Sequence, residues 1–281
     1  MTNLSEKAML VNVTIKGHSF RKLDKKATQE VNSNNNASND AGRYNKALIA
    51  REYLKDITRI SGAIRVYHYT NTLAWSDSGG RILPAKHYIE YMDKMNKLIQ
   101  EYKEVVQNFI YNYDSYVVHA QNNLGALFNI DEYPHISDIE HKFSVSIHVL
   151  PLSTKDDFRV DIQADIAQEI KENIERDFNN SIKNSISDLW DRLKTGVLAM
   201  SEKLKNEDAI FRNTLVTNLC DLCNLLEKFN LTEDKNLTAI SNEIKEKLCK
   251  NEPDILREDK ETRKNTAKQA QDILDKMSGY C

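Results

Sequence analysis

Two cysteines three residues apart, Cys220 and Cys223, have the C-x-x-C spacing that serves zinc sites and redox motifs. Both uses need a knuckle or a strand-to-helix junction, and zinc needs a second pair of ligands. Here the motif lies in a leucine-rich helical pattern without glycine, and no second C-x-x-C or H-x-x-H follows. Free cysteine is commonly a small core residue, so packing is favoured, with redox or metal use as the alternative. Nothing suggests export, so no stable disulfide is expected.

Neither the histidines nor the paired aspartates match a catalytic template. The sequence contains no H-E-x-x-H, nucleophile elbow or phosphate-binding loop. Asp156, Asp157 and Asp161 could bind a cation, although aspartates in such a position more often solvate a turn. We therefore expect no catalytic residues, metal or cofactor, and a protein that is not an enzyme. An active site assembled from distant segments is the alternative.

The segment from Arg65 to Arg81 gathers aromatic and charged residues in a stretch of little regular periodicity. Ordered aromatic loops bind protein partners or nucleic-acid bases more often than chance would give. The alternative is a structural loop whose aromatic rings plug the end of a helical bundle. The candidate partner-binding residues are Tyr67, His68, Tyr69, Trp75, Asp77 and Arg81.

The amino-acid composition limits the kinds of secondary structure that can position these residues. Only 8 glycines and 4 prolines occur in 281 residues, far below average usage, so the chain cannot make the many turns of a sandwich or barrel. The 39 basic and 42 acidic residues give a net charge of −3 and no general attraction to nucleic acid or membranes. No apolar run long enough to span a membrane and no signal-peptide core occur, so a soluble cytoplasmic protein is expected.

Alternation of apolar and polar residues predicts a few strands. Met9 to Ile15 and Phe143 to Val149 alternate clearly, and Phe158 to Ile162 is expected to pair with the latter as a hairpin. A short β candidate at residues 27–31 precedes a polar, low-complexity stretch at 32–40 that reads as a mobile loop.

Helical periodicity dominates the rest of the chain. Apolar residues from Tyr88 to Leu127 alternate in steps of four and three, the heptad seam of a coiled coil. Tyr91 and Tyr111 fall off this seam and could face a partner or another helix. From Ile166 to Ile186 the steps are all four, so that face should wrap around its helix. A third helix carries leucines from Leu215 to Leu226 and ends near Phe229.

The predicted fold is mainly α with a small β-sheet. Residues 1–83 and 128–163 would form a small α+β head, and residues 84–127 a long heptad helix. Residues 164–250 would form a helical bundle, and residues 251–281 a polar C-terminal helix. The expected architecture is an α+β head joined to a long antiparallel bundle or coiled coil.

Several short stretches within about residues 45–200 form a distinctive set: Ser61 to Arg65, His68-Tyr69, Thr72-Leu73, Trp75 to Asp77, Arg81 to Pro84, Leu124-Gly125 through Phe128, Tyr133-Pro134, Phe143, and Asp157 to Val160. In these stretches the chain resembles a phage-associated family of unknown function. Some members of that family are encoded beside AAA+ ATPases and von Willebrand-type proteins. The resemblance implies no activity, but the neighbouring genes suggest an adaptor.

The sequence thus predicts a non-enzymatic, phage-encoded coiled-coil interaction or adaptor protein. A protein partner is expected, an AAA+ ATPase among the candidates, and the seams could also pair between copies of the chain. The alternative is a nucleic-acid-associated phage factor that uses the 65–81 aromatics. Basic clusters at Arg21-Lys22 and Lys25-Lys26 would assist such binding.

Overall fold

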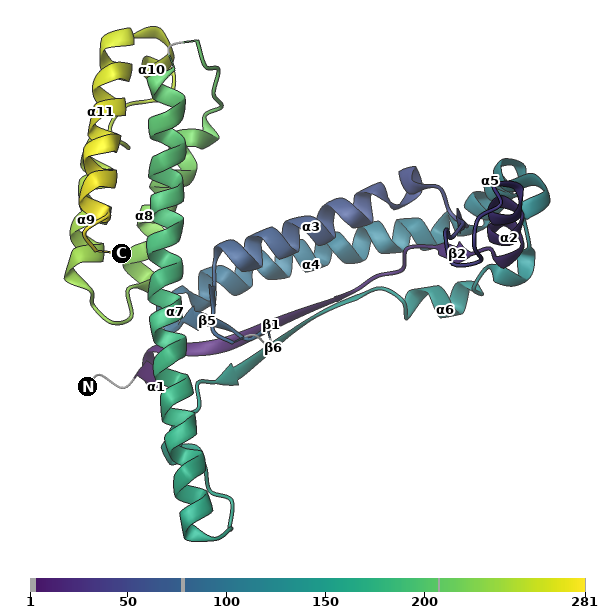
Figure 1. Cartoon of the computed structure of the whole chain (residues 1–281), viewed down its shortest axis with the longest axis horizontal. Coiled ribbons are helices and arrows are strands. Elements are labelled where there is room, and N and C mark those ends of the chain that lie inside the picture. Colours follow the sequence, from purple (N-terminus) through teal and green to yellow (C-terminus); the bar gives the residue numbers. More distant parts are fainter. Residues whose placement is uncertain (1–3, 77–78, 207, 281) are drawn as a thin grey trace. The chain divides into compact units, whose positions relative to one another are not determined.

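A computed structural model describes residues 4–76, 79–206 and 208–280, and it is mainly α-helical with a small antiparallel sheet (Figure 1), as predicted. The chain forms two compact units. One, the bundle unit, comprises Met1–Asn12, Thr70–Tyr91 and His148–Cys281. The other, the helix-pair unit, comprises Val13–Tyr69 and Met92–Ile147. This division differs from the expected one, because periodicity shows where an element lies and not which distant element covers it.

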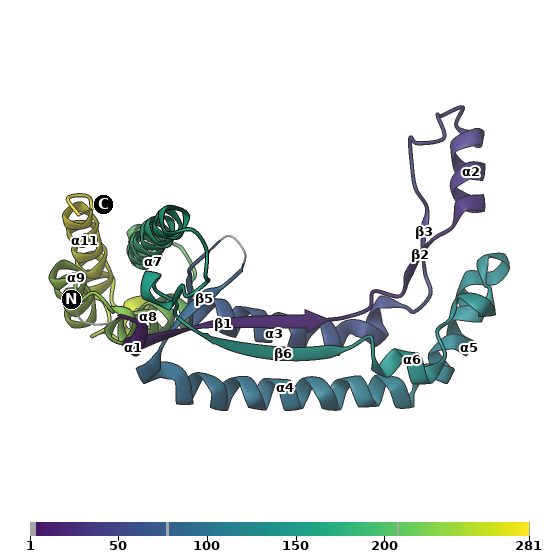
Figure 2. The same cartoon turned by 90° about the horizontal axis from the view of Figure 1, so that it is seen from below.

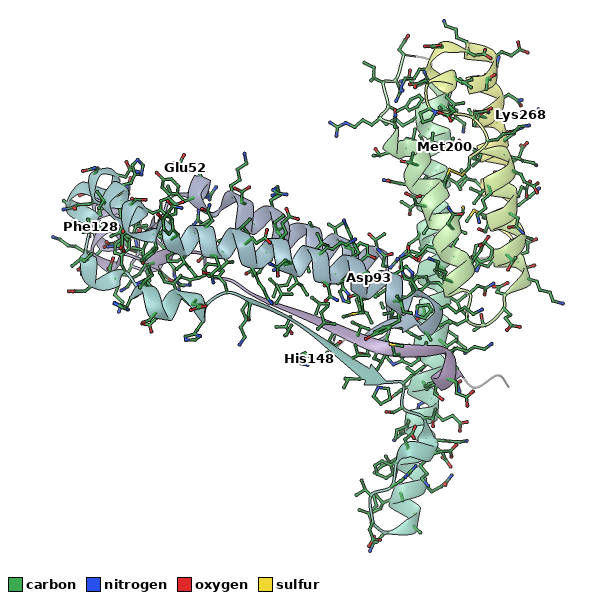
Figure 3. The ribbon with its side chains drawn as sticks, turned by 180° about the vertical axis from the view of Figure 1, so that it is seen from behind. Glu52, Asp93, Phe128, His148, Met200 and Lys268 are labelled. Atoms are coloured by element: carbon green, nitrogen blue, oxygen red, sulfur yellow. A yellow bond between two sulfur atoms is a disulfide. The ribbon has the colours of Figure 1, made fainter. Side chains whose placement is uncertain are left out.

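Four helices form the core of the bundle unit. They are α7 (Ala164–Lys205), α8 (Thr214–Phe229), α9 (Lys235–Lys247) and α11 (Lys260–Met277). Helices α8 and α11 both pack on α7, and α9 packs on α8 and α11, which closes the ring. Figure 3 labels Met200, fully buried on α7, and Lys268, exposed on α11.

The C-terminal helix belongs to this bundle although its sequence is largely polar. Residues Ala270, Ile273 and Met277 are fully buried, because the few apolar residues of α11 recur on one face. The short α10 (Ile255–Glu258) precedes it. On α7, a Cβ added at Gly196 would lie 3.0 Å from Leu219 Cδ1, so glycine permits the close approach of α8.

The helix-pair unit holds the predicted heptad seam, but as two helices. Helix α4 (Tyr88–Tyr111) begins in the bundle unit and continues through this one (Figure 2). It stops at Asn112, and α5 (Tyr113–Leu124) follows and ends at Gly125, whose φ is +49°. The seam packs on aromatic residues of the same unit: Phe109 lies 5.4 Å from Phe20 and 5.9 Å from Phe143, between ring centroids.

Shorter elements complete the helix-pair unit. Strands β2 (Arg21–Leu23) and β3 (Asn45–Ala47) form an antiparallel pair around α2 (Lys25–Asn34). The others are α3 (Lys55–Thr70), α6 (Ile136–Glu140) and the 3₁₀ turns η1 (Arg51–Leu54), η3 (Gly125–Leu127) and η4 (Ile130–Glu132). Another 3₁₀ turn, η2 (Ala85–His87), lies in the bundle unit.

The main sheet has the order β4-β5-β1-β6. Its strands are β1 (Ala8–Lys16), preceded by α1 (Leu4–Lys7), β4 (Leu73–Ala74), β5 (Arg81–Pro84) and β6 (Ser144–Pro151). Ala8 is opposite Pro84, and Leu73 is opposite Ile82. Strands β1 and β6 confirm the two clearest alternating patterns.

Two predicted strands are wrong. Residues 158–163 have no regular structure, and the turn before them is a 3₁₀ helix, η5 (Lys155–Asp157), which packs on α7. Residues 27–31 lie inside α2, where the carboxylate of Asp24 accepts a hydrogen bond from Ala27 N at 3.0 Å and caps the helix. An alternating pattern at residues 158–162 does not ensure that a partner strand lies beside it. At residues 27–31, the N-cap from Asp24 favours a helix more strongly than the short alternating pattern favours a strand.

Candidate functional site

The predicted 65–81 segment is not a single irregular loop. Its first part, through Thr70, completes α3, Leu73–Ala74 form β4, and Arg81 begins β5. Tyr67, His68 and Tyr69 belong to the helix-pair unit, whereas Trp75 and Arg81 belong to the bundle unit. Asp77 lies outside the described residues. The segment therefore contributes separately to each unit.

On α3, the exposure of the predicted residues differs sharply. His68 is only 5% exposed, whereas Tyr69 is 55% exposed. Their ring centroids are 5.5 Å apart. Val66, one turn before, is 66% exposed, so Tyr69 and Val66 together place apolar area at the surface of α3. Tyr91, expected off the seam, is fully buried, while Tyr111 is exposed.

In the bundle unit, Trp75 and Arg81 make structural contacts. The Trp75 ring meets Phe178 of α7 edge to face at 5.3 Å and packs against the bundle core. Arg81 Nε donates to Thr72 Oγ1 at 2.6 Å, and its Nη2 donates to Thr72 O at 2.9 Å. Arg192 of α7 also donates to Thr72 O, at 2.9 Å. Arg81 thus holds the turn before β4 from β5, and Arg192 holds it from α7.

The cysteine motif does not pair with itself. Cys220 of α8 forms a disulfide with Cys249, which follows α9, so the expectation of no disulfide is wrong for this pair. Cys223 is free and fully buried, as core packing predicts, and burial raises the pKa of its thiol to about 11. The pairing joins residues 29 positions apart, a relation that C-x-x-C spacing does not indicate.

Asp157 lies in a hydrogen-bonded turn, which agrees with the expectation that aspartates in this position solvate a turn. Asp157 accepts hydrogen bonds from Thr154 N at 2.7 Å and Thr154 Oγ1 at 3.0 Å. Across the described ranges, no group of three or more histidine, cysteine, aspartate or glutamate side chains is placed to hold a metal ion. No helix within the same ranges is long and apolar enough to cross a membrane.

A charged cleft of about 580 Å³ lies in the bundle unit, where α1 meets the end of α8 and the start of α9. Lys7 Nζ forms an ion pair with Glu233 Oε1 at 3.0 Å. Lys228, which also lines the cleft, forms an ion pair with Glu90, and its Nζ lies 3.4 Å from His87 Nδ1. Thr238 Oγ1 donates to the carbonyl of Asp234 at 2.9 Å. Sequence spacing could not identify this cleft, because its charged groups come from three distant segments.

The N-terminal half of α7 has no buried residue. We call residues 164–184 the arm, because the buried residues of α7 begin only at Ser185. The apolar stripe predicted from four-residue spacing runs along it. Ile166 is 44% exposed, and Ile170, Ile174, Phe178 and Ile182 are half-buried. The 3₁₀ helix η5 packs on α7, and its Lys155 forms an ion pair with Glu175 of the arm at 2.8 Å.

Comparison of the chain with family models, curated proteins and solved structures gave no match.

Proposed function

We propose that this chain is a non-enzymatic interaction protein whose arm binds a helix of another protein. The supporting observation is the arm itself, a helical segment with isoleucine or phenylalanine at every fourth residue from Ile166 to Ile182 and no buried side chain before Ser185. Most helical stability in proteins comes from packing an amphipathic face on another surface. The arm therefore needs a further surface to cover it.

The spacing of the stripe favours a helix as the covering element. Residues four apart form a ridge along a helix, and such ridges pack into the grooves between the ridges of another helix. The segment after η5 adds apolar area beside the arm, since Val160 is 60% and Ile162 is 38% exposed. The resemblance to a phage-associated family makes a host-cytoplasmic adaptor the context to test first, with an AAA+ ATPase as the first candidate partner.

The test uses a matched pair of positions on α7. Ile166 in the arm and Leu198 in the bundle are each 44% exposed, so Ile166→Ser and Leu198→Ser remove similar apolar area from one helix. Photo-crosslinking groups placed at the same two positions would identify the protein in contact, after nuclease treatment. The affinity of each purified variant for that protein would then be measured.

We expect Ile166→Ser to weaken the complex about tenfold or more, because a buried aliphatic side chain contributes roughly 1.5–3 kcal/mol. Leu198→Ser should leave the affinity unchanged. Equal effects at the two positions, or crosslinks only at Leu198, would rule the arm out as the binding surface. Light scattering of the protein alone shows whether a second copy of the chain is the one that binds.

The nucleic-acid alternative rests on one observation. Arg21, Lys22, Lys25 and Lys26 are all exposed, on β2 and the first turn of α2. Lys22 lies 3.7 Å from Glu132, which offsets part of this charge. Binding of a labelled single strand that weakens steeply with salt would support this alternative. Absence of binding at low salt would remove it.

A further inference from the structure

A hollow of about 270 Å³ in the helix-pair unit is lined by two stacked tyrosines and three carboxylate side chains. The rings of Tyr53 on η1 and Tyr116 on α5 have centroids 4.0 Å apart and planes 14° from parallel. His119 meets Tyr53 edge on at 5.6 Å, and Phe109 backs Tyr116 at 5.5 Å. The stack is therefore held by neighbours from α4 and α5.

The carboxylates give this hollow an excess of negative charge. Glu52, Asp56 and Glu104 line it, and all three are exposed. Asp56 lies 3.5 Å from Arg59, whereas Glu52 and Glu104 have no lysine or arginine within ion-pair distance in the part of the chain that the structure describes. Burial, and then the charge of Glu52, raise the pKa of Tyr53.

Tyrosine rings beside carboxylates without a cationic partner favour one class of ligand. Gln100 Nε2 donates to Glu104 Oε1 at 3.0 Å, but this amide carries no charge. A cation over a tyrosine ring is attracted by the ring's quadrupole, and a guanidinium also stacks flat and donates paired hydrogen bonds to carboxylates. An anion would be repelled, and an apolar group would desolvate carboxylates without pairing them. We propose that this hollow binds the guanidinium group of an arginine carried by a segment of a partner protein.

The surroundings favour a protein segment over a free small cation. Glu104 also lines a shallow depression along the outer face of α4, together with Asp93, Lys97 and Glu101. Figure 3 labels Glu52, which lines the hollow, and Asp93, which lines the depression. Residues that flank an arginine in the hollow could thus lie along α4. This inference shares with the proposed function only the assumption that the partner is a protein, and it uses a different unit.

The first experiment titrates the full chain with acetyl-arginine-N-methylamide and follows the tyrosine ring signals by NMR. The uncharged isostere acetyl-citrulline-N-methylamide is the ligand control. We expect saturable shifts of the Tyr53 and Tyr116 signals with arginine only, assigned with Tyr53→Phe and Tyr116→Phe. Equal shifts with citrulline, or no saturable shift, would overturn the proposal.

The matched variants are Glu52→Gln and Glu104→Gln against Glu101→Gln, which changes the same charge on α4 outside the hollow. Each of the first two should weaken arginine-amide binding about threefold, as for an exposed ion pair, while Glu101→Gln leaves it unchanged. Circular dichroism confirms that each variant is folded. If Glu101→Gln weakens binding as much as Glu52→Gln, general charge explains the binding and the hollow is not the site.

A second comparison identifies the source of the cation. The peptide acetyl-Lys-Gly-Arg-Gly-Lys-amide should bind more tightly than methylguanidinium, and Glu101→Gln should weaken the peptide alone. Methylguanidinium binding as tightly as the peptide would refute a protein segment as the ligand. Ile166→Ser should not change either affinity, so failure of the arm and failure of this site are distinguishable.

Discussion

The guanidinium of Arg263 on α11 donates from Nε to the main-chain carbonyl of Leu204, at the end of α7, over 3.2 Å. Its Nη2 also donates to the carbonyls of Lys203 at 3.1 Å and Ala209 at 2.9 Å. The group lies over the Phe211 ring, 5.4 Å from its centroid, and the residue is 6% exposed. The last carbonyls of a helix lack partners within it, so Arg263 supplies donors that α7 needs.

Replacing Arg263 with Met should destabilise the bundle unit by about 2–4 kcal/mol, because several carbonyls lose a charged donor at a buried position. Both tryptophans, Trp75 and Trp190, lie in the bundle unit. Urea unfolding followed by tryptophan fluorescence therefore reports this unit selectively.

The control for Arg263 is its neighbour on the exposed face of α11. Lys264→Met removes the same charge and should change the free energy of unfolding by less than about 0.5 kcal/mol. If the Arg263 variant is as stable as the Lys264 variant, water forms hydrogen bonds with the carbonyls at the end of α7, and Arg263 does not stabilise the bundle unit.

The disulfide between Cys220 and Cys249 should stabilise the bundle unit. It closes a loop over a separation of 29 residues, and the lost entropy of the unfolded chain corresponds to about 3.5 kcal/mol. We expect Cys249→Ala to lower the free energy of unfolding by roughly this amount without reductant, and reductant to lower the wild type to the same level.

Cys223→Ala is the matched variant, because Cys223 is buried on the same helix but free. It should lose stability through a small cavity, and its response to reductant should equal that of the wild type. A wild type equally stable with and without reductant would show that Cys220 and Cys249 do not form the bond in solution.

Local patterns predicted the elements well where one chain segment carries the whole signal. The seam through Val106 and Phe109 is buried as its spacing indicates, because helical periodicity depends only on near neighbours. The same seam does not show what covers it, and Phe20 and Phe143 come from distant segments. The seam therefore packs at least partly on aromatic residues of the same unit, and its pairing as a coiled coil stays a prediction.

The candidate site was harder to predict than the fold for the same reason. Trp75 stood out by composition but packs on Phe178, a partner about a hundred positions away. Tyr53 and Tyr116 carry no local motif, and only folding brings their rings together. Residue type marks a candidate binding residue, whereas its neighbours decide whether the side chain serves packing or binding.

Lys46 is a buried lysine of the helix-pair unit, and its replacement should lower the stability of that unit. The residue is 4% exposed. Its Nζ lies 3.0 Å from Asp24 Oδ2 and 2.8 Å from Glu132 Oε2, and it donates to Leu127 O at 2.7 Å. Lys46→Met leaves two carboxylates without their shared cation and should cost about 3–5 kcal/mol. Hydrogen exchange in residues 21–47 would measure the loss.

Lys22→Met tests whether any nearby cation would serve, since Lys22 is half-exposed and lies 3.7 Å from Glu132. It should change exchange little. Burial alone would lower the pKa of Lys46, but its bonds to Glu132 and Asp24 outweigh burial and raise that pKa. The stabilisation from the charge of Lys46 is therefore present at neutral pH and is lost as pH rises above about 10.5. Loss of protection near neutral pH would contradict this assignment.

His87 should make the bundle unit less stable as the pH falls below about 6.5. It is 1% exposed, and its Nε2 lies 2.9 Å from Asn71 Oδ1. Asn71 Oδ1 can only accept, so Nε2 carries a proton and donates to it. In the neutral ring, Nδ1 can then accept from Lys228 Nζ at 3.4 Å, and Glu90 Oε2 lies at the same distance from Nδ1. Burial, and then the charge of Lys228, lower the pKa of His87, with Glu90 acting in the opposite direction.

Because the folded pKa of His87 is lowered, the unfolded chain binds a proton that the folded chain does not in the range below about pH 6.5. The free energy of unfolding should therefore fall with decreasing pH, by at most about 1.4 kcal/mol per pH unit for one such group. Urea unfolding by tryptophan fluorescence between pH 7.5 and 5.5 would measure this slope. That range keeps the carboxylates of Glu90 and Glu233, whose pKa values are lowered, ionised.

His87→Gln keeps a donor and an acceptor but removes the titration, so its stability should be nearly independent of pH in this range, whatever its absolute value. His148→Gln, at an exposed position of the same unit, should retain the wild-type slope. If the slope is the same in the wild type and in His87→Gln, the imidazole is accessible to protons in the folded protein and the buried network of Asn71, His87 and Lys228 does not hold it neutral.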